Sequence, residues 1–162
     1  MVLEHNFSPI VDINSKVLIL GSFPSVKSRE NNFYYGNDKN RFWKILSESL
    51  NVDMPKTIDE KKEMLINNNI AIWDTIKSCE IKASDDSSIK NVKVNDIHSL
   101  VKKYGIRNII FNGNAAYKFY KKYVGNIENV EEYILPSTSP ANAKFKYEEL
   151  YKVWNNTLKS II

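Results

Sequence analysis

Four short apolar runs, separated by stretches of helical period, constrain the fold of this chain most strongly. Each run is rich in β-branched or aromatic side chains and is bounded by polar or turn residues. The runs are residues 16–20 (KVLIL), 70–73 (IAIW), 108–111 (NIIF) and 132–135 (EYIL). Runs of this length and composition are typical of strands that are buried on both faces of a parallel sheet.

The stretches between and after these runs repeat apolar side chains every three or four residues, which predicts helices. The expected helices span residues 41–50, 58–68, 96–104, 114–123 and about 146–161. Strands that alternate with helices predict an α/β fold with three layers, α/β/α, around a central four-stranded, mostly parallel sheet. Residues 77–92 (KSCEIKASDDSSIKNV) are polar and low in periodicity, and we interpret them as a surface excursion.

Length and composition bound the class of protein. The 162 residues contain no repeat or linker, so a single domain spanning residues 1–162 is expected. No apolar run reaches the roughly 18 residues of a membrane span, and MVLEHNFSPIVDINSK lacks the pattern of a signal peptide. We therefore expect a cytoplasmic protein without a membrane partner. A single Cys79 with two histidines, His5 and His98, argues against a metal site, and no cofactor is expected.

The net charge of +4 and the pI near 9.0 are compatible with a polyanionic partner. A lysine-rich composition alone explains the same bias equally well.

Three segments that follow the predicted strands have a length or composition that a simple connecting loop does not require. About twenty residues, GSFPSVKSRENNFYYGNDKN, follow the first run, and loops of that length in compact domains are usually functional or disordered. Three successive aromatics argue against disorder. Asn112 follows NIIF directly, and PSTSPANA follows the last run. Ligands bind outside the carboxyl ends of such strands, so these segments predict a binding site. Capping and plain turns are the alternatives for Asn112 and PSTSPANA.

In this order the motifs resemble the uracil-DNA glycosylase superfamily, most closely its hypoxanthine-DNA glycosylase (DNA-deoxyinosine glycosylase) branch. The motifs are GSFPS, YYGNDKNRFW, FNG and STSPANA. Each is weak alone, but the ordered set covers nearly the whole chain. The resemblance implies a four-stranded parallel sheet flanked by helices. It also implies a monofunctional, monomeric hydrolase of base excision repair that removes hypoxanthine and/or uracil from DNA containing deaminated bases.

The resemblance assigns base binding to three residues. Tyr35 matches the position where the family stacks an aromatic on the extruded base, and Phe23 is a second candidate. The Asn112 amide is suited to the lactam edge of uracil and hypoxanthine, because it can donate to the carbonyl and accept from the ring N–H. Core packing is the alternative for one or two of the aromatics Phe33, Tyr34 and Tyr35.

Catalysis is expected to rely on an asparagine. Many relatives carry Asp or Asn where this chain has Phe23, and the branch it resembles uses an asparagine of the following stretch. Asn40 is the expected catalytic residue and Asn37 the second candidate, although Asn40 is an equally good helix cap. Because GSFPS, FNG and STSPANA contain no carboxylate, we expect leaving-group stabilisation and slow turnover. Asp74, at a strand end, is the alternative carboxylate.

The resemblance implies that the loop containing STSPANA binds the DNA backbone. It also implies that this loop inserts a side chain into the base stack, in the space that the extruded base leaves. Ser139 matches the phosphate-binding serine of the family. The wedge falls on Ala141, where other branches carry a larger residue, so we expect weak help with base extrusion. The backbone and wedge candidates are Ser137, Ser139, Ala141 and Asn142. The basic residues expected to meet phosphates, or simply to be solvated, are Arg29, Lys39 and Arg41.

Two other classes of function stay open. A non-catalytic nucleic-acid or nucleotide binder of the same fold would keep the pocket, and Phe23 in the place of a water-positioning residue makes that class conceivable. An unrelated small-molecule α/β enzyme is the other class, but the chain has no GxGxxG or Walker-type loop to support it.

Overall fold

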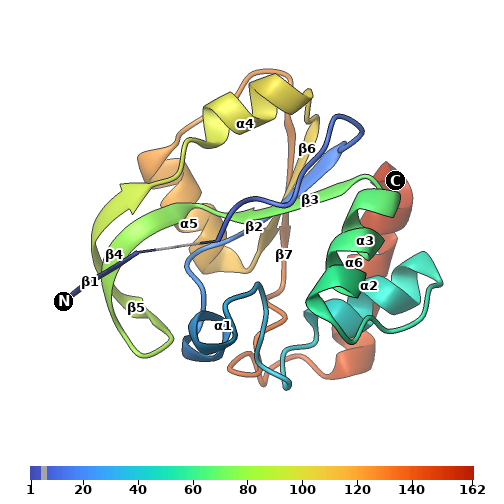
Figure 1. Cartoon of the computed structure of the whole chain (residues 1–162), viewed down its shortest axis with the longest axis horizontal. Helices are drawn as coiled ribbons and strands as arrows, with labels where there is room; N and C mark the ends of the chain where they lie inside the picture. The colour runs from blue at the N-terminus through green and yellow to red at the C-terminus, as the bar shows by residue number, and fades with distance from the viewer. Residues whose placement is uncertain (5–6) are drawn as a thin grey trace.

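The main sheet has four strands in the order β3-β2-β6-β7, all parallel (Figure 1). In this computed structural model, which describes residues 1–4 and 7–162, the strands are β2 (Val17–Gly21), β3 (Ile70–Asp74), β6 (Asn108–Asn112) and β7 (Glu131–Leu135). Each predicted strand is present, with ends shifted by one residue at most. The register places Gly21 opposite Asp74 and Asn112 opposite Leu135, which aligns the carboxyl ends of the strands.

Helices cover both faces of this sheet, which confirms the three-layer prediction. Along β2, Val17 and Ile19 pack against one side of the molecule, and Leu18 and Leu20 pack against the other, as expected for a strand buried on both faces. The first side is covered by α2 (Phe42–Leu50), α3 (Ile58–Asn67) and α6 (Tyr147–Ile161), and the second by α4 (Ile97–Tyr104) and α5 (Asn114–Tyr123). Among the described residues, no helix is long and apolar enough to cross a membrane.

A second sheet was not predicted. The antiparallel strands β4 (Ile76–Lys82) and β5 (Asp85–Val94) form a hairpin where the sequence indicated only a surface excursion, and β1 (Val2–Glu4) pairs with β4. The pairing of β4 with β5 shifts register three times, and most of β5 is exposed. Register shifts remove the strict alternation of apolar and polar residues that identifies a strand in a sequence. A small cluster of Phe23, Ile76 and Cys79 anchors the hairpin to the loop after β2.

The long loop after β2 is ordered by its own contacts. It contains a short helix, α1 (Val26–Asn31), capped by the Ser25 side chain, which accepts a hydrogen bond from the Ser28 N–H at 3.1 Å. Phe33 and Tyr34 are buried in the core at 6% and 2% exposure, so the alternative of core packing holds for these two aromatics. Tyr35 is the third aromatic of the series and lies at the edge of a cavity.

Candidate active site

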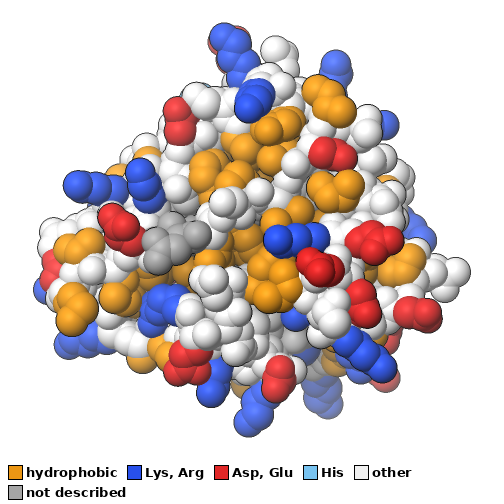
Figure 2. Space-filling view, viewed as in Figure 1, with side chains coloured by type: hydrophobic (Ala, Val, Ile, Leu, Met, Phe, Trp, Pro, Cys, Tyr) orange, Lys and Arg blue, Asp and Glu red, His pale blue; other side chains and the backbone are white. Residues whose placement is uncertain are grey.

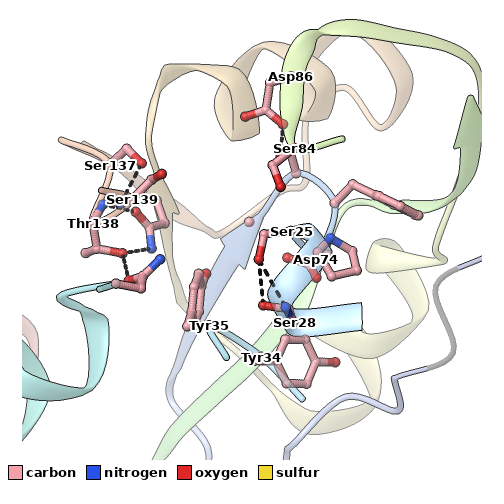
Figure 3. Close-up of a pocket in the computed structure, with 16 residues that line it drawn as sticks. Ser25, Ser28, Tyr34, Tyr35, Asp74, Ser84, Asp86, Ser137, Thr138 and Ser139 are labelled. Atoms are coloured by element: carbon pink, nitrogen blue, oxygen red, sulfur yellow. Dashed lines mark hydrogen bonds between the residues drawn. The ribbon is translucent and has the colours of Figure 1, made fainter. Parts of the chain in front are cut away.

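A cavity of about 100 Å³ opens at the carboxyl ends of β2, β3 and β6. The three segments predicted from the sequence meet there: the loop after β2, Asn112 at the end of β6, and residues 137–139 after β7. Figure 3 shows Ser137, Thr138 and Ser139 on one side of it, Asp86 and Ser84 on another, and Tyr35 and Asp74 below these two groups in this view. The wall formed by Ser84 and Asp86 belongs to the unpredicted hairpin.

Thr138 connects the two asparagines of the site (Figure 3). The Asn112 Nδ2 group donates to Thr138 Oγ1 at 3.0 Å, and the Thr138 N–H donates back to Asn112 Oδ1 at 2.9 Å. The Thr138 hydroxyl then donates to Asn40 Oδ1 at 2.8 Å. Thr138 is fully buried. Sequence reasoning missed this residue, although it stands between the two serines that were singled out.

The amide of Asn40 is oriented by two donors. Its Oδ1 accepts from the Thr138 hydroxyl and, at 2.9 Å, from the N–H of Phe42, the first residue of α2. Both lone pairs of this oxygen are therefore used, and the Nδ2 group carries the remaining hydrogen-bonding capacity. Asn40 thus supports the start of α2, as its alternative role required, and still offers N–H donors at the cavity. A group with only donors left stabilises negative charge but takes no proton from water.

Asn37 does not line this cavity. Its Oδ1 accepts from the Lys39 N–H at 3.0 Å, and its carbonyl oxygen accepts from the Asn40 N–H at 2.8 Å. Asn37 therefore shapes the turn that presents Asn40.

The aromatic candidates Phe23 and Tyr35 both line the cavity. Phe23 is 7% exposed, and the Arg29 guanidinium carbon lies 5.6 Å from its ring centroid. The Tyr35 ring stacks on Phe42 with 4.0 Å between centroids and 27° between planes. One face of Tyr35 is thus committed to the core, and stacking of either ring on a base stays a prediction.

Gly21 leaves room for two polar groups at the floor of the cavity. A Cβ atom at position 21 would lie 2.3 Å from Asp74 Oδ1 and 3.2 Å from the Tyr35 hydroxyl, so any larger residue would displace them. Asp74 is only 4% exposed. Burial and then the charge of Asp74 raise the pKa of Tyr35, whereas the Asn112 amide opposes the rise. The Tyr35 hydroxyl therefore stays protonated at neutral pH.

The hairpin contributes a second carboxyl group. The Ser22 hydroxyl donates to Asp86 Oδ1 at 2.9 Å and ties the hairpin to the loop after β2. Loss of hydration raises the pKa of Asp86, the Ser22 hydrogen bond opposes the rise, and the charges of Asp74 and Asp85 add to it. Because register shifts disguise the hairpin in the sequence, no signal there pointed to Asp86.

The loop after β7 is held in a tight shape by its own side chains. Ser137 Oγ accepts from the Ser139 N–H at 3.1 Å, and Ser139 Oγ accepts from the Ala141 N–H at 3.2 Å. Asn142 Nδ2 donates to the Ser137 carbonyl at 3.0 Å. Ser137 and Ser139 line the cavity, whereas Ala141 and Asn142 lie outside its lining. Contact of these four residues with DNA stays a prediction.

Two of the three basic residues expected to meet phosphates are engaged inside the protein. Arg41 donates to four carbonyl oxygens of the loop after β7, those of Thr138, Ser139, Asn142 and Phe145, at 3.4, 2.9, 3.1 and 2.6 Å. Arg29 donates to the carbonyls of Pro24 and Ala83, which joins α1 to the hairpin. These contacts hold both guanidinium groups against the protein, and contact of Arg29, Lys39 and Arg41 with phosphates stays a prediction. On the face shown in Figure 2, Lys and Arg side chains are dispersed among acidic ones.

Arg41→Ala is expected to lower the free energy of unfolding by roughly 2 kcal/mol, because hydrogen bonds from a charged donor contribute about 1.5–3 kcal/mol. Urea unfolding of both proteins measures the difference. Arg41→Lys is the matched control, since it keeps the charge but not the fork of donors, and it should recover only part of the loss. Full recovery by lysine would show that the charge alone matters.

Metal ligands do not gather in the part of the chain that the structure describes: no group of three or more His, Cys, Asp or Glu side chains is suited to hold an ion there. His5 lies outside the described residues.

Comparison with known proteins identifies the family of the chain. The family model for the uracil DNA glycosylase superfamily matches residues 8–159. A hypoxanthine DNA glycosylase of Methanosarcina acetivorans is 34% identical over 146 residues, which are 89% of this chain and 91% of that protein. A hypoxanthine DNA glycosylase of Methanosarcina barkeri is 29% identical over 144 residues, with 87% and 89% coverage. The solution NMR structure of a uracil DNA glycosylase candidate from Methanosarcina acetivorans superposes with a TM-score of 0.84 and 30% identity over 99% of both chains. The chain belongs to the uracil DNA glycosylase superfamily, as its ordered motifs indicated.

Proposed function

We propose that this protein is a monofunctional DNA glycosylase that hydrolyses the N-glycosidic bond of hypoxanthine, and of uracil as a second substrate, in DNA containing deaminated bases. The observation that carries the proposal is the cavity itself, in which Asn40 and Asn112 are joined through Thr138 beside two aromatic rings. Family membership and the names of the two Methanosarcina relatives support it. We expect the protein to act as a cytoplasmic monomer.

In the proposed reaction, the bond between the sugar C1′ and the base nitrogen breaks and its electron pair leaves with the base. Water then adds to the oxocarbenium-like sugar and loses a proton to solvent. The Asn40 N–H group is suited to stabilise the negative charge that develops on the departing base, because both lone pairs of its carbonyl oxygen are already used. This role matches a slow enzyme that relies on leaving-group stabilisation.

The residues that line and flank the cavity suggest where the extruded base and the DNA backbone would bind. The extruded base would enter between the rings of Phe23 and Tyr35, with Asn112 at its edge. Ser137 and Ser139 would meet the phosphates at the rim, where their loop is fixed by Arg41. The small side chain of Ala141 would leave the vacated stack poorly filled, so mismatched or single-stranded substrates should be favoured.

Purified protein in chelator is expected to leave alkali-labile abasic sites in oligonucleotides that hold deoxyinosine or deoxyuridine. The reason is that the residues lining the cavity supply donors and aromatic faces and need no metal for the step described. Single-turnover assays with hypoxanthine, uracil and xanthine lesions measure it, with an undamaged duplex as control. Activity that depends on added metal contradicts the mechanism, and tight binding without an abasic product would favour the non-catalytic alternative.

A further inference from the structure

A carboxyl group from the hairpin lies at the opening of the cavity. Asp86, on β5, is an exposed residue that also lines the cavity, together with Ser84 (Figure 3). Its Oδ1 atom accepts a hydrogen bond from the Ser22 hydroxyl at 2.9 Å, which leaves Oδ2 for a further contact. Asp74 is the other carboxyl group of the lining, but it lies at the floor and is buried. Asp86 is therefore the carboxyl group that water at the opening can reach.

The fold does not need a charge at this position. Two other contacts tie the hairpin to the loop after β2, because the Val26 N–H donates to Ser84 Oγ and the Arg29 guanidinium donates to the Ala83 carbonyl, both at 2.9 Å. A neutral amide would accept the Ser22 hydrogen bond as well. A negative charge at the opening also repels the phosphates of DNA and weakens binding. A carboxylate that folding does not require and that opposes binding points to a role in the reaction.

The sides of the cavity are suited to different parts of a hydrolysis. Asn40 is bonded to Thr138, on the side formed by the loop after β7, where the departing base is proposed to gain its negative charge. The hairpin forms another side, with Asp86 on it (Figure 3). When water adds to a sugar carbon from the face away from the leaving group, hydrolases place a carboxylate on that face and leave room for the water.

We propose that Asp86 is a catalytic carboxylate of this glycosylase, which stabilises the positive charge on the sugar and takes a proton from the attacking water. The inference rests on the proposed function and deepens it. The bond between C1′ and the base nitrogen breaks, and its electron pair leaves with the base, which later takes a proton from solvent. The water oxygen bonds to C1′, and its proton passes to Asp86 and from there to solvent. The hairpin thus supplies the carboxylate that position 23, a phenylalanine in this chain, does not.

The surroundings of Asp86 set the pH at which it acts. The charged and titratable groups around it are Asp85 beside it, Asp74 at the end of β3, Cys79 on β4 and Arg29 on α1. Loss of hydration raises the pKa of Asp86, the Ser22 hydrogen bond opposes the rise, and the two aspartates add to it. Because the carboxylate is the active form, excision should be complete above this pKa and fall as the pH is lowered through it. The raised pKa places this acid fall at a higher pH than an ordinary aspartate would.

The test measures single-turnover excision of hypoxanthine as a function of pH, from mildly acidic to mildly basic buffer. Asp86→Asn keeps an acceptor for the Ser22 hydroxyl and removes the charge. It should lower excision above the pKa by at least about tenfold and abolish the acid fall. Its affinity for DNA that holds an abasic-site analogue should not decrease, since a charge that repels phosphates is gone.

Asp85→Asn is the matched control, since it removes the neighbouring charge from a residue that does not line the cavity. It should keep the rate and move the acid fall to slightly lower pH, because the charge of Asp85 raises the pKa of Asp86.

A wild-type rate above the pKa in Asp86→Asn, an acid fall that persists in it, or a wild-type profile without that fall would overturn the inference and leave the glycosylase function intact. Failure of wild-type protein to excise hypoxanthine at any pH would instead overturn the function. If melting curves show that Asp86→Asn does not fold, Ser22→Ala decides. It keeps the carboxylate and removes the hydrogen bond that lowers its pKa, so the acid fall should move to higher pH, and an unmoved fall overturns the inference.

Discussion

Asn40→Asp is expected to reduce single-turnover excision of hypoxanthine by roughly 10²–10³-fold, the usual effect of removing one donor that stabilises developing negative charge. Aspartate retains an acceptor for the Phe42 N–H and for the Thr138 hydroxyl, which hold Asn40 in place. It replaces the Nδ2 group by an oxygen, so a donor at the cavity becomes a negative charge. The substitution therefore removes the proposed chemistry and keeps the start of α2.

The companion variants separate catalysis from structure. Asn40→Ala removes both acceptors, so it should lower the melting temperature as well as the rate, whereas Asn40→Asp should lower the rate alone. Asn37→Ala tests the second candidate, which shapes the turn outside the cavity. If Asn40→Asp keeps the wild-type rate while Asn37→Ala loses it, the catalytic role belongs to Asn37.

The sequence was sufficient to predict the main sheet because its strands are buried on both faces. Such strands are short, continuous apolar runs, and the helices between them have a clear period. Predicted helix bounds match at both ends for α5 and differ by one residue at one end for the others. The hairpin of β4 and β5 was not predicted, because it has one exposed side and an irregular register. Its residues therefore show neither a continuous apolar run nor a regular period.

The candidate site was predictable as a set of segments but not as a set of contacts. Parallel strands bring their carboxyl ends to one edge, so the loop after β2, Asn112 and residues 137–139 had to be neighbours. Spacing along the chain says nothing about which donors each side chain meets. The sequence suggested Arg41 as a candidate for phosphate contact but gave no sign of its four carbonyl partners. It did not single out Thr138, to which both asparagines are hydrogen-bonded.

Asn112→Ala is expected to lower hypoxanthine excision at least about 100-fold, because Asn112 is proposed to bind the base and is joined through Thr138 to Asn40. In the wild-type protein the Asn112 Nδ2 group donates to the Thr138 hydroxyl, which leaves that hydroxyl free to donate onward to Asn40. Without Asn112, the N–H of a fully buried Thr138 loses its acceptor, at a cost of about 1–3 kcal/mol. Affinity for DNA containing an abasic-site analogue should change little, since the serines at the rim remain.

Asn112→Asp shows why the direction of these hydrogen bonds matters. An aspartate still accepts from the Thr138 N–H, but it offers the Thr138 hydroxyl an acceptor where the wild type offers a donor. The Thr138 hydroxyl has one proton, which it can donate either to the residue 112 carboxylate or to Asn40 Oδ1. The charged carboxylate is the stronger acceptor, so the hydrogen bond to Asn40 is weakened. Excision should therefore fall nearly as far as in the alanine variant although the fold is better preserved.

Combining Asn112→Ala with Thr138→Val should add little to either single loss of excision, because both substitutions act on the same chain of hydrogen bonds. Fully additive losses, or equal losses of excision and DNA binding, would show that Asn112 serves folding and that the path through Thr138 to Asn40 carries no catalysis.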